Sequence, residues 1–366
     1  MWTFILQYNV TKYIMANKIT KYLIKGIMLI FTIFIAILGI IIKLSGNETF
    51  QDNWFITILG FIMVPILLAN FLFLLYWVFK KSYILLLPLV ILILDFNILT
   101  SIFQINFNKA DNKNSITIAT YNVHNFTFNH KDNTIEQIAI ALHKNNSDIV
   151  CLQEFGLNKN SLKIIKQNYP YSYTPISKYR RHEMAILSKY PIVDSGQIEF
   201  SRTINSTLFA VVKVGKKKIK IINTHLQTTN INQSWKEIGI LKDDISIDKN
   251  KVKTFNTLKD RIMYNVKKRK VQVDTISSII QNTPYSVIVC GDFNDTPASY
   301  TYKQIDKYLH DGFKTCGSGY MHTIGGSYGM LRIDYIFHSD SITGIKYYCP
   351  NIKYSDHKPV FMKFSI

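Results

Sequence analysis

Three long apolar runs within the first 105 residues constrain the fold of this chain more than any other feature of its sequence. These runs, residues 26–42, 54–79 and 82–105, together contain one charged side chain, Asp95. A helix that crosses a bilayer needs about 20 consecutive apolar residues, and lysine side chains at its ends can reach the polar surface. We therefore predict a membrane region, residues 1–110, with three transmembrane helices at about 23–43, 54–79 and 82–105.

Two of these runs have an alternative interpretation. The first could be a secretory signal peptide, but no small-residue cleavage site follows it and two further apolar runs do, so we prefer a membrane helix. The third would place Asp95 and Asn97 inside the hydrocarbon, where an ionisable group is unfavourable unless it faces another helix or water. A re-entrant or interfacial segment therefore remains open for the third run.

Lysine residues mark the ends of the apolar runs and predict an orientation. The lysines before the first run and between the second and third runs are Lys12, Lys18, Lys21, Lys25, Lys80 and Lys81. Cytoplasmic loops carry an excess of Lys and Arg, so we expect a multi-pass integral membrane protein whose large domain, residues 111–366, is extracytoplasmic and faces the periplasm in a bacterium. If the third run does not cross, the same rule places that domain inside. An extracytoplasmic domain would allow Cys316 and Cys349 to pair.

The chain is strongly basic, with a formal net charge of +19 at pH 7. Such a charge favours polyanionic partners, either nucleic acid or an anionic membrane surface. A solvated, Lys-rich face explains the charge equally well. The densest basic runs, 216–220 and 266–270, lack the interleaved aromatic residues that a nucleic-acid stacking platform would have.

The large domain alternates short β-branched runs with segments of helical periodicity. Strand-like runs occupy residues 115–123, 148–154, 184–188, 208–214, 219–226, 287–290, 332–339, 345–349 and 359–366. Between the first two runs, Ile135, Ile138 and Leu142 recur at helical spacing. Strands that alternate with helices indicate an α/β fold. A polar stretch from 229 to about 254 has no clear period, and we expect it to be a surface excursion.

Polar residues follow these runs at the points where the strands end. They are Asn122, Glu154, His225, Asp292, Asn294, Asp334, Asp356 and His357. Functional groups of α/β proteins gather at the carboxyl ends of strands. One such residue can belong to an ordinary turn, as the GDFND segment at 291–295 could, but the repetition predicts convergence on one rim. Carboxylate and amide oxygens gathered there suit a hard divalent cation.

The order of these motifs resembles that of the endonuclease/exonuclease/phosphatase superfamily, the metal-dependent phosphoesterases that include pancreatic deoxyribonuclease, neutral sphingomyelinases and inositol polyphosphate phosphatases. The matching segments, which extend over residues 116–366, are YNV, LQE, MAILSKYPI, NTHL, GDFND, RIDYIF and SDHKPV. The resemblance implies an α/β catalytic domain built as a four-layer α-β-β-α sandwich, preceded here by three transmembrane helices, with its site at one rim of the sandwich.

The resemblance also implies a metal site, with Mg²⁺ or Mn²⁺ as the cofactor. Glu154 would be the principal ligand of the cation, Asn122 would lie beside it, and Asp356 would complete the metal side of the site.

Five further residues would act on the substrate. His357 would serve as general base or orient the attacking water, and Asp334 would fix its tautomer. Asp292 and Asn294 would position or activate the water, and Asn294 would also bind the phosphoryl oxygens. His225 would bind the substrate and either protonate the leaving group or stabilise the pentavalent phosphate.

The expected activity is that of a membrane-anchored, Mg²⁺-dependent hydrolase acting on phosphoester bonds. It would cleave a phosphodiester or phosphomonoester, such as a lipid head group or another small phosphate ester, by direct attack of water. An extracytoplasmic nuclease that cleaves DNA or RNA is the first alternative, and a non-catalytic, membrane-tethered phosphate-binding protein is the second. The expected partners are the phosphoester substrate and the lipid bilayer, and the sequence leaves the oligomeric state open.

Overall fold

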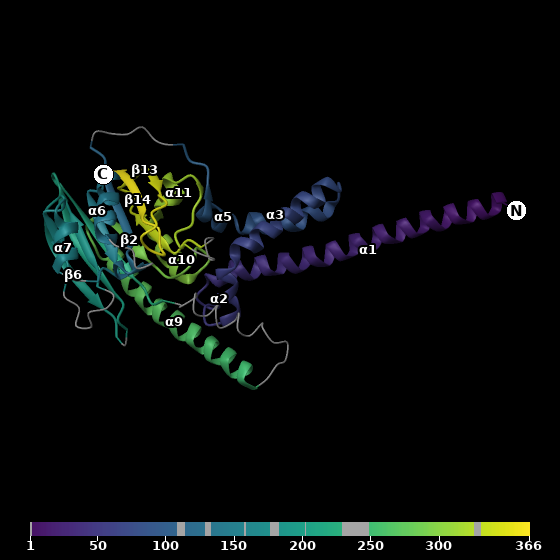
Figure 1. Cartoon of the computed structure of the whole chain (residues 1–366), viewed down its shortest axis with the longest axis horizontal. Helices are drawn as coiled ribbons and strands as arrows, with labels where there is room; N and C mark the ends of the chain where they lie inside the picture. Colours follow the sequence, from purple (N-terminus) through teal and green to yellow (C-terminus); the bar gives the residue numbers. More distant parts are fainter. Residues whose placement is uncertain are drawn as a thin grey trace.

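The computed structural model consists of a long helical arm and an α/β body (Figure 1). The N-terminus lies at the far end of the arm, and the C-terminus lies in the body. The described residues are 2–107, 114–128, 133–156, 159–175, 183–201, 203–228, 249–325 and 331–366.

The first sheet of the body has six strands. The pair β2–β3 is parallel and the other neighbours are antiparallel. In spatial order the strands are β13 (Thr343–Tyr348), β14 (Val360–Ser365), β2 (Ile116–Asn122), β3 (Ile149–Gln153), β5 (Ala185–Ser188) and β4 (Tyr171–Tyr173). The parallel pair brings the carboxyl ends of β2 and β3 to the same edge.

The second sheet also has six strands and one parallel pair, β8–β9. In spatial order the strands are β10 (His310–Asp311), β12 (Asp334–His338), β9 (Ser286–Asp292), β8 (Lys217–His225), β7 (Ser206–Val214) and β6 (Ile192–Glu199). His225 pairs directly with Asp292, and Asp292 pairs with Asp334. Three of the predicted site residues therefore lie side by side at one sheet edge.

The two sheets pack face to face and helices cover their outer faces. In β2, Ile116 and Ile118 join the core between the sheets, whereas Ala119 and Tyr121 join the cluster under the helices, as a period of two requires. The covering helices are α6 (Thr134–Lys144) and α7 (Lys159–Lys166) on the first sheet, and α9 (Lys249–Gln281) and α10 (Tyr300–Asp306) on the second. The expected α/β class with two sheets between helices is confirmed.

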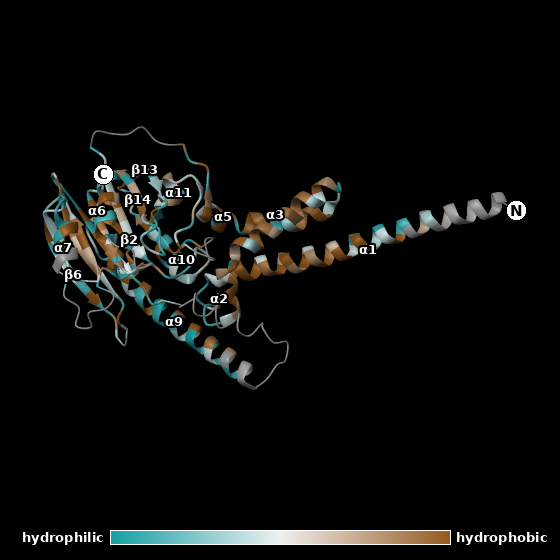
Figure 2. Cartoon of the chain, viewed as in Figure 1, coloured by the Kyte–Doolittle hydropathy of each residue, from teal (hydrophilic) through white to brown (hydrophobic). Residues whose placement is uncertain are grey.

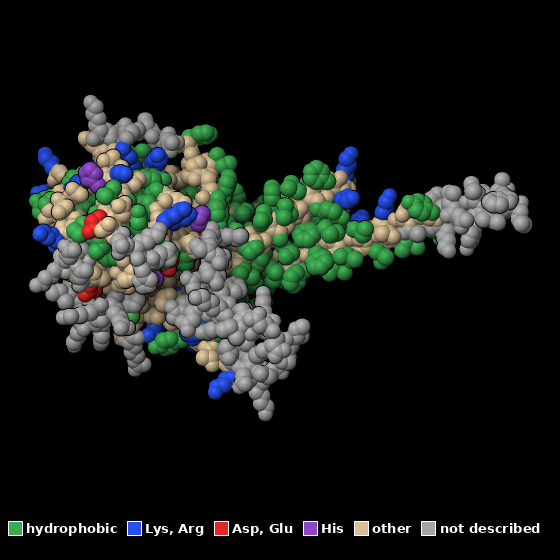
Figure 3. Space-filling view, viewed as in Figure 1, with side chains coloured by type: hydrophobic (Ala, Val, Ile, Leu, Met, Phe, Trp, Pro, Cys, Tyr) green, Lys and Arg blue, Asp and Glu red, His purple; other side chains and the backbone are tan. Residues whose placement is uncertain are grey.

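The arm consists of consecutive helices. They are α1 (Trp2–Ser45), α2 (Trp54–Phe61), α3 (Met63–Phe79), the 3-10 helix η1 (Tyr83–Leu85), α4 (Leu86–Leu94) and α5 (Phe96–Ile102). Among the described residues, one helical segment, Asn17–Ser45, is long and apolar enough to cross a membrane by itself. The number rises to three if each of two bent helix pairs counts as one span. Figure 2 shows the hydrophobic character of α1 and α3, and Figure 3 shows lysine and arginine side chains at the end of the apolar surface away from the body.

The prediction of three transmembrane helices is not confirmed, because the second and third runs are broken. The second bends by 70° between α2 and α3, where Ile62 leaves helical geometry. The third bends by 65° at Asp95. Asp95 is fully buried against α1, where a Cβ on Gly39 would lie 3.5 Å from its Oδ2. Apolar composition indicates burial or lipid contact, but it does not show whether a helix is straight.

Hydrogen bonds join the arm to the body at the end of α1 and at the end of α5. Ser45 Oγ donates to Ala298 O at 2.9 Å, and Arg332 Nη1 donates to Ser101 O at 2.8 Å. The short strands β1 (Phe103–Gln104) and β11 (Gly319–Tyr320) pair across the junction. The predicted boundary at residue 110 stays a prediction, although strand pairing already begins before it.

Three smaller features complete the fold. The short helices η2 (His124–Phe126) and α11 (Gly312–Cys316) lie in the body. Cys316 and Cys349 form no disulfide bond in the described structure, so the pairing considered for them is not found. Most of the polar stretch expected at 229–254 lies outside the described residues, and α9 already begins at Lys249.

Candidate active site

The eight predicted site residues gather at one rim of the sandwich. Strands β2, β3, β8 and β9 end there, β12 begins there, and the segment before β14 passes over them. Contacts among the eight side chains and their immediate neighbours link the whole set, as the distances below describe. The expected convergence of strand ends is therefore found.

A histidine–aspartate pair forms the most buried part of the rim. His357 Nδ1 lies 3.0 Å from Asp334 Oδ2, and His357 Nε2 lies 3.7 Å from Asp292 Oδ2. Among the described residues, these three form the group of acidic and histidine side chains whose ligand atoms all lie within 4.8 Å of one another. Burial would lower the pKa of His357, but the carboxylates of Asp334 and Asp292 outweigh it and raise that pKa well above its ordinary value. The two carboxylates therefore favour the protonated form of the ring.

Asp292 stands at the centre of the rim and is almost completely buried. Burial raises its pKa to about 6; the like charge of Asp334 adds to this shift, and the two histidines oppose it. The backbone N–H of Asn294 donates to Asp292 Oδ1 at 2.8 Å, and Asn294 Nδ2 donates to Leu226 O at 3.0 Å. Asn294 thus fixes the loop that follows β9, with a backbone φ of 52°.

Only glycine fits at the position before Asp292. Gly291 has a φ of 136°, and a Cβ there would lie 1.9 Å from the carbonyl oxygen of Thr224. This close approach of β9 to β8 brings Asp292 opposite His225. The glycine of the GDFND motif is thus required by packing rather than by turn flexibility.

Asn122 links the two sheets at the rim. Its Nδ2 donates to Glu154 Oε1 at 3.2 Å and to Asp292 Oδ2 at 3.0 Å. His225 Nε2 lies 3.7 Å from the same Glu154 oxygen and 3.8 Å from the same Asp292 oxygen. One residue from each sheet therefore meets both carboxylates.

Glu154 occupies the outer side of the rim, where it is partly exposed. Its backbone φ is 50°, a strained conformation for a residue other than glycine. Asn125 Nδ2 donates to Glu154 Oε2 at 3.4 Å, and His124 Nδ1 lies 4.0 Å from the same oxygen. A strained backbone conformation persists only where the surrounding structure holds it in place, and such conformations cluster at active sites.

His124 also joins Asp356 to this outer group. Its Nδ1 lies 3.1 Å from Asp356 Oδ1. This hydrogen bond raises the pKa of His124 above its ordinary value. Burial would raise the pKa of Asp356, but the hydrogen bond from His124 and the charge of His357 lower it to about 2. Asp356 is therefore ionised at neutral pH.

The outer side supplies oxygen donors of the kind a hard divalent cation takes, although the compact group of acidic and histidine ligand atoms in the described residues is Asp292, Asp334 and His357. His124 Nδ1 lies 4.0 Å from Glu154 Oε2 and 3.1 Å from Asp356 Oδ1, so one imidazole nitrogen links the two carboxylates. In this structure Asn122 turns its amide nitrogen toward Glu154. A rotation of the amide by 180° would turn its oxygen toward Glu154 instead, where it could bind a cation. Two carboxylates and an amide oxygen are the ligand types that Mg²⁺ takes.

Several residues that support the site were not predicted. Gln153 Nε2 donates to Thr120 Oγ1 at 2.9 Å and to Asn223 Oδ1 at 2.6 Å, so a buried network connects the sheets directly under Glu154 and His225. Gln153 and Asn223 belong to the LQE and NTHL motifs, so their positions were available as a signal. His124 and Asn125 directly follow the YNV motif, but they occupy no strand end, which is why strand-end reasoning missed them.

Comparison with known proteins agrees with this geometry. A family model described as the endonuclease/exonuclease/phosphatase family matches residues 119–357, and a domain of unknown function matches residues 25–102. No curated protein matches the chain. The structure of D. rerio TDP2 complexed with a single-strand DNA product is similar in fold, with a TM-score of 0.51 and 17% identity over 69% of this chain and 99% of that one. Truncated Caenorhabditis elegans TDP2 gives a TM-score of 0.50 and 16% identity over 69% and 98%. Because the family model matches more than half of the chain, the protein belongs to the endonuclease/exonuclease/phosphatase family and is a hydrolase acting on phosphoester bonds.

Proposed function

We propose that the protein is a membrane-anchored, divalent-cation-dependent hydrolase that cleaves a phosphodiester or phosphomonoester by direct attack of water. The observation that carries this proposal is the meeting of a histidine–aspartate pair, a second buried aspartate and an asparagine-linked glutamate at one rim. These residues are His357, Asp334, Asp292, Asn122 and Glu154. Each contacts another member of the set, so they can act together on one phosphate group.

Asp292 is the group best suited to accept a proton from the attacking water. A general base is most effective when its pKa lies near the operating pH, and burial raises the pKa of Asp292 to about 6. The protonated form of His357 is favoured instead, since Asp334 and Asp292 raise its pKa. Of the two roles expected for His357, this charge supports orienting the water and the phosphoryl oxygens.

His225 is suited to the leaving group. Its Nε2 faces Glu154 and Asp292, at 3.7 and 3.8 Å, and its side chain is almost completely buried. In the proposed reaction the water oxygen bonds to phosphorus while the bond from phosphorus to the leaving oxygen breaks. The water proton passes to Asp292, and His225 gives a proton to the leaving oxygen. No covalent intermediate with the protein forms.

A cation, Mg²⁺ or Mn²⁺, would be held by Glu154, Asn122 and Asp356. When bound, it would neutralise negative charge on the phosphoryl and leaving oxygens. The protein contributes the placement of these ligands: the strained backbone and Asn125 fix Glu154, and Ser355 Oγ donates to the Asn122 carbonyl at 2.7 Å.

The side of the membrane on which the body lies would depend on α1 alone. The C-terminal end of α1 touches the body through Ser45, and α5 returns to the body at Ser101. The bent pairs therefore leave the body and come back to it, whether they cross fully or re-enter on the same side. With the lysine-rich N-terminus in the cytoplasm, the body is extracytoplasmic in both cases. The sequence alone had made this outcome depend on the third run.

Aromatic side chains at the junction support the bilayer as a partner. Trp54 packs edge-on against Phe55 and Phe255, with ring centroids 5.9 and 5.2 Å apart. Phe55 and Phe255 remain partly exposed. Trp54 follows the end of the α1 span closely, and aromatic residues are favoured at the membrane surface. In the basic run of α9, residues 266–270, Arg269 is buried against Asp295 and Lys270 pairs with Glu48 and Asp274. The exposed Lys267 is the member of this run best placed to attract anionic lipids.

A nuclease remains the second candidate. The similar D. rerio TDP2 structure is described as a complex with a single-strand DNA product, and the net charge of +19 favours a polyanion. The non-catalytic alternative is not proposed again, because the chain belongs to a family of hydrolases.

Full-length protein in detergent is expected to hydrolyse a bis-aryl phosphodiester in the presence of Mg²⁺. EDTA should abolish the activity and excess Mg²⁺ or Mn²⁺ should restore it, because the ligand set consists of oxygen donors. Release of the aryl product is the measurement, alongside plasmid DNA and phospholipid vesicles as substrates. His357→Ala should nearly abolish this activity, because the ring contacts both buried aspartates. His143→Ala is its matched control, since His143 is exposed, and should leave the rate unchanged. Cleavage of plasmid with inert lipids would favour the nuclease, and no turnover on the whole panel would contradict the proposal.

A reporter fused after Ile366 is expected to lie outside the cytoplasm. A fusion after Lys81 should be inactive if α2 and α3 cross the membrane together, and active if they re-enter on the same side. Alkaline phosphatase, which is active only after export, should be active in the fusion after Ile366 in both cases. The reason is the lysine-rich start of α1 together with the contact between its other end and the body. An inactive phosphatase after Ile366, with a fluorescent green fluorescent protein at the same position, would place the body in the cytoplasm.

A further inference from the structure

The short helix α2 contacts the body and the membrane bundle through different faces. Trp54, Ile58 and Phe61 are spaced as one stripe of a helix. All three touch the body: Trp54 packs on Phe255, Ile58 on the buried side chains of α9, and Phe61 on a separate cluster. Leu59 faces the other way and joins the cluster between α1 and α3. A helix that packs on both sides can transmit a displacement from one to the other.

Phe61 fills a small hydrophobic cluster in the body. Its partners are Ile324, Leu331 and Ile333, and all four side chains are at most 7% exposed. Ile333 is the residue before Asp334, and Ile324 forms a β-bridge with His357. A side chain from the arm thus supports both segments that carry the histidine–aspartate pair.

Thr323, next to Ile324, ties these segments together. Its Oγ1 accepts hydrogen bonds from the backbone N–H groups of Ile333 and Asp334, at 3.0 and 3.1 Å. Its carbonyl accepts from the N–H of Lys358, the residue after His357, at 2.7 Å. The side chain of Thr323 is fully buried, so these bonds form without competition from water. The position of the Phe61 cluster therefore influences both partners of the pair.

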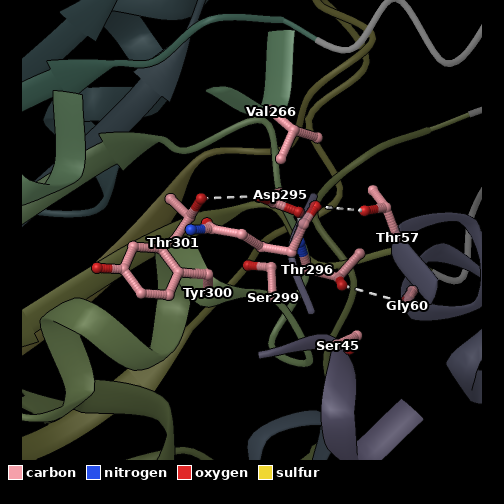
Figure 4. A pocket seen from close by; sticks show the side chains of 10 residues that line it. Ser45, Thr57, Gly60, Val266, Asp295, Thr296, Ser299, Tyr300 and Thr301 are labelled. Atoms are coloured by element: carbon pink, nitrogen blue, oxygen red, sulfur yellow. Dashed lines mark hydrogen bonds between the residues drawn. The ribbon is translucent and has the colours of Figure 1, made fainter. Parts of the chain in front are cut away.

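A second contact of α2 reaches the loop that follows Asp292 at the end of β9. Thr296 Oγ1 donates to the carbonyl of Gly60, the residue before Phe61, at 3.0 Å (Figure 4). Thr296 follows Asn294 by two residues, and the two lie on the same loop after β9. The N–H of Phe293 in this loop donates to Ile333 O at 2.9 Å. Gly60 and Phe61 therefore touch both segments that carry the two buried aspartates.

We infer that α2 is a positioning element of the active site, and that Phe61 aligns Asp334 and His357 with Asp292 through its cluster with Ile324, Leu331 and Ile333. The arm then does more than tether the body to a membrane, since the catalytic geometry depends on the seating of α2. The inference rests on the proposed hydrolytic function for its kinetic consequence, but its structural consequence can be measured without a substrate.

The test compares Phe61→Ala with Phe61→Leu in the full-length protein in detergent. Phe61→Ala should lower kcat on the bis-aryl phosphodiester by about 10- to 100-fold with little change in KM, because small displacements of catalytic groups have effects of this size. Phe61→Leu, which refills most of the cluster, should recover most of the rate. In hydrogen exchange, amides of peptides containing Ile333 and Asp334 should exchange faster in Phe61→Ala and return to near the wild-type rate in Phe61→Leu. Thr296→Val, which removes the bond to Gly60 with little change in shape, should give a smaller fall in kcat.

Phe79→Ala is the matched control, because Phe79 is 82% exposed at the far end of α3. It should leave kcat and exchange unchanged. Wild-type kcat and wild-type exchange in Phe61→Ala would overturn the inference, as would equal losses in Phe61→Ala and Phe79→Ala. If the wild-type protein hydrolyses nothing, the proposed function fails, and the exchange of Ile333 and Asp334 still decides the positioning role of Phe61.

Discussion

Asp292→Asn is expected to lower kcat for phosphodiester hydrolysis by about 10²- to 10⁴-fold, the range for removal of a general base. The amide has the shape of the carboxylate but cannot accept the water proton at neutral pH. Asp292 accepts a hydrogen bond at each oxygen, from the Asn294 N–H at Oδ1 and from Asn122 Nδ2 at Oδ2. The oxygen of the new amide can keep the bond from Asn294, whereas its NH₂ group finds a partner only if Asn122 turns its own amide oxygen toward it. Steady-state kinetics of the full-length protein with Mg²⁺ are the measurement.

The same variant should not be less stable than the wild-type protein in EDTA. Burial raises the pKa of Asp292 to about 6, above its value of 3.8 without such surroundings. A raised acid pKa means that the folded state prefers the protonated form, so stability falls as the pH rises from about 4 through about 6. At pH 8 the neutral amide removes this penalty, and thermal unfolding should begin no earlier than in the wild-type protein. Asp194→Asn on the exposed face of β6 is the control; a large loss of stability in Asp292→Asn alone would show that its loss of activity reflects misfolding.

Arg332→Met is expected to reduce the free energy of unfolding by about 3–5 kcal/mol, the range for breaking a buried ion pair from one side. Arg332 is fully buried, and its guanidinium meets Asp311 with Nη1 at 2.6 Å from Oδ2. The same nitrogen donates to Ser101 O, and the ring of Tyr335 lies 4.7 Å from the guanidinium carbon. Removing the cation leaves the Asp311 carboxylate buried without its charge partner. The midpoint of thermal unfolding in detergent, followed by circular dichroism, measures the effect.

Two comparisons separate the ion pair from a general effect of losing positive charge. Lys213→Met removes an exposed cation near the end of β7 and should change the midpoint little. Arg332→Met combined with Asp311→Asn should be less destabilised than Arg332→Met alone, because no unpaired charge remains. An unfolding midpoint of Arg332→Met equal to that of the wild-type protein would contradict a stabilising role for the pair.

The pattern of apolar and polar residues predicted the architecture of the body, but it did not predict that of the arm. The β-branched runs of the body have short lengths and polar ends, so both the strands and their shared rim could be predicted. The helices of the arm are apolar on all sides. Without a polar face, their sequence does not show which side of each helix packs against protein and which faces lipid. The stripe of Trp54, Ile58 and Phe61, which faces a protein surface, was therefore indistinguishable from lipid-facing residues. The bend at Asp95 was signalled only by the charged residue itself.

The predicted site residues were brought together, but their interactions with one another required coordinates. Strand-end positions predict which side chains share a rim, because the carboxyl ends of parallel neighbours coincide. They do not give the protonation of His357, which depends on how close Asp292 and Asp334 lie. They also miss residues in irregular segments, such as His124 and Thr323, whose contacts arise from loops without a period. The roles assigned to the eight predicted residues stay predictions until variants are measured.

The pairing of β1 with β11 has a practical consequence for biochemistry on this protein. A recombinant fragment starting near residue 106 would lose β1, the Ser101 carbonyl and Phe61 together. Hydrophobic side chains and an unpaired strand would then be exposed to solvent. Such surfaces promote aggregation during purification. Absence of phosphoester hydrolysis by this fragment would therefore not show that the full-length protein is inactive. Substrate screening should begin with the full-length protein in nanodiscs.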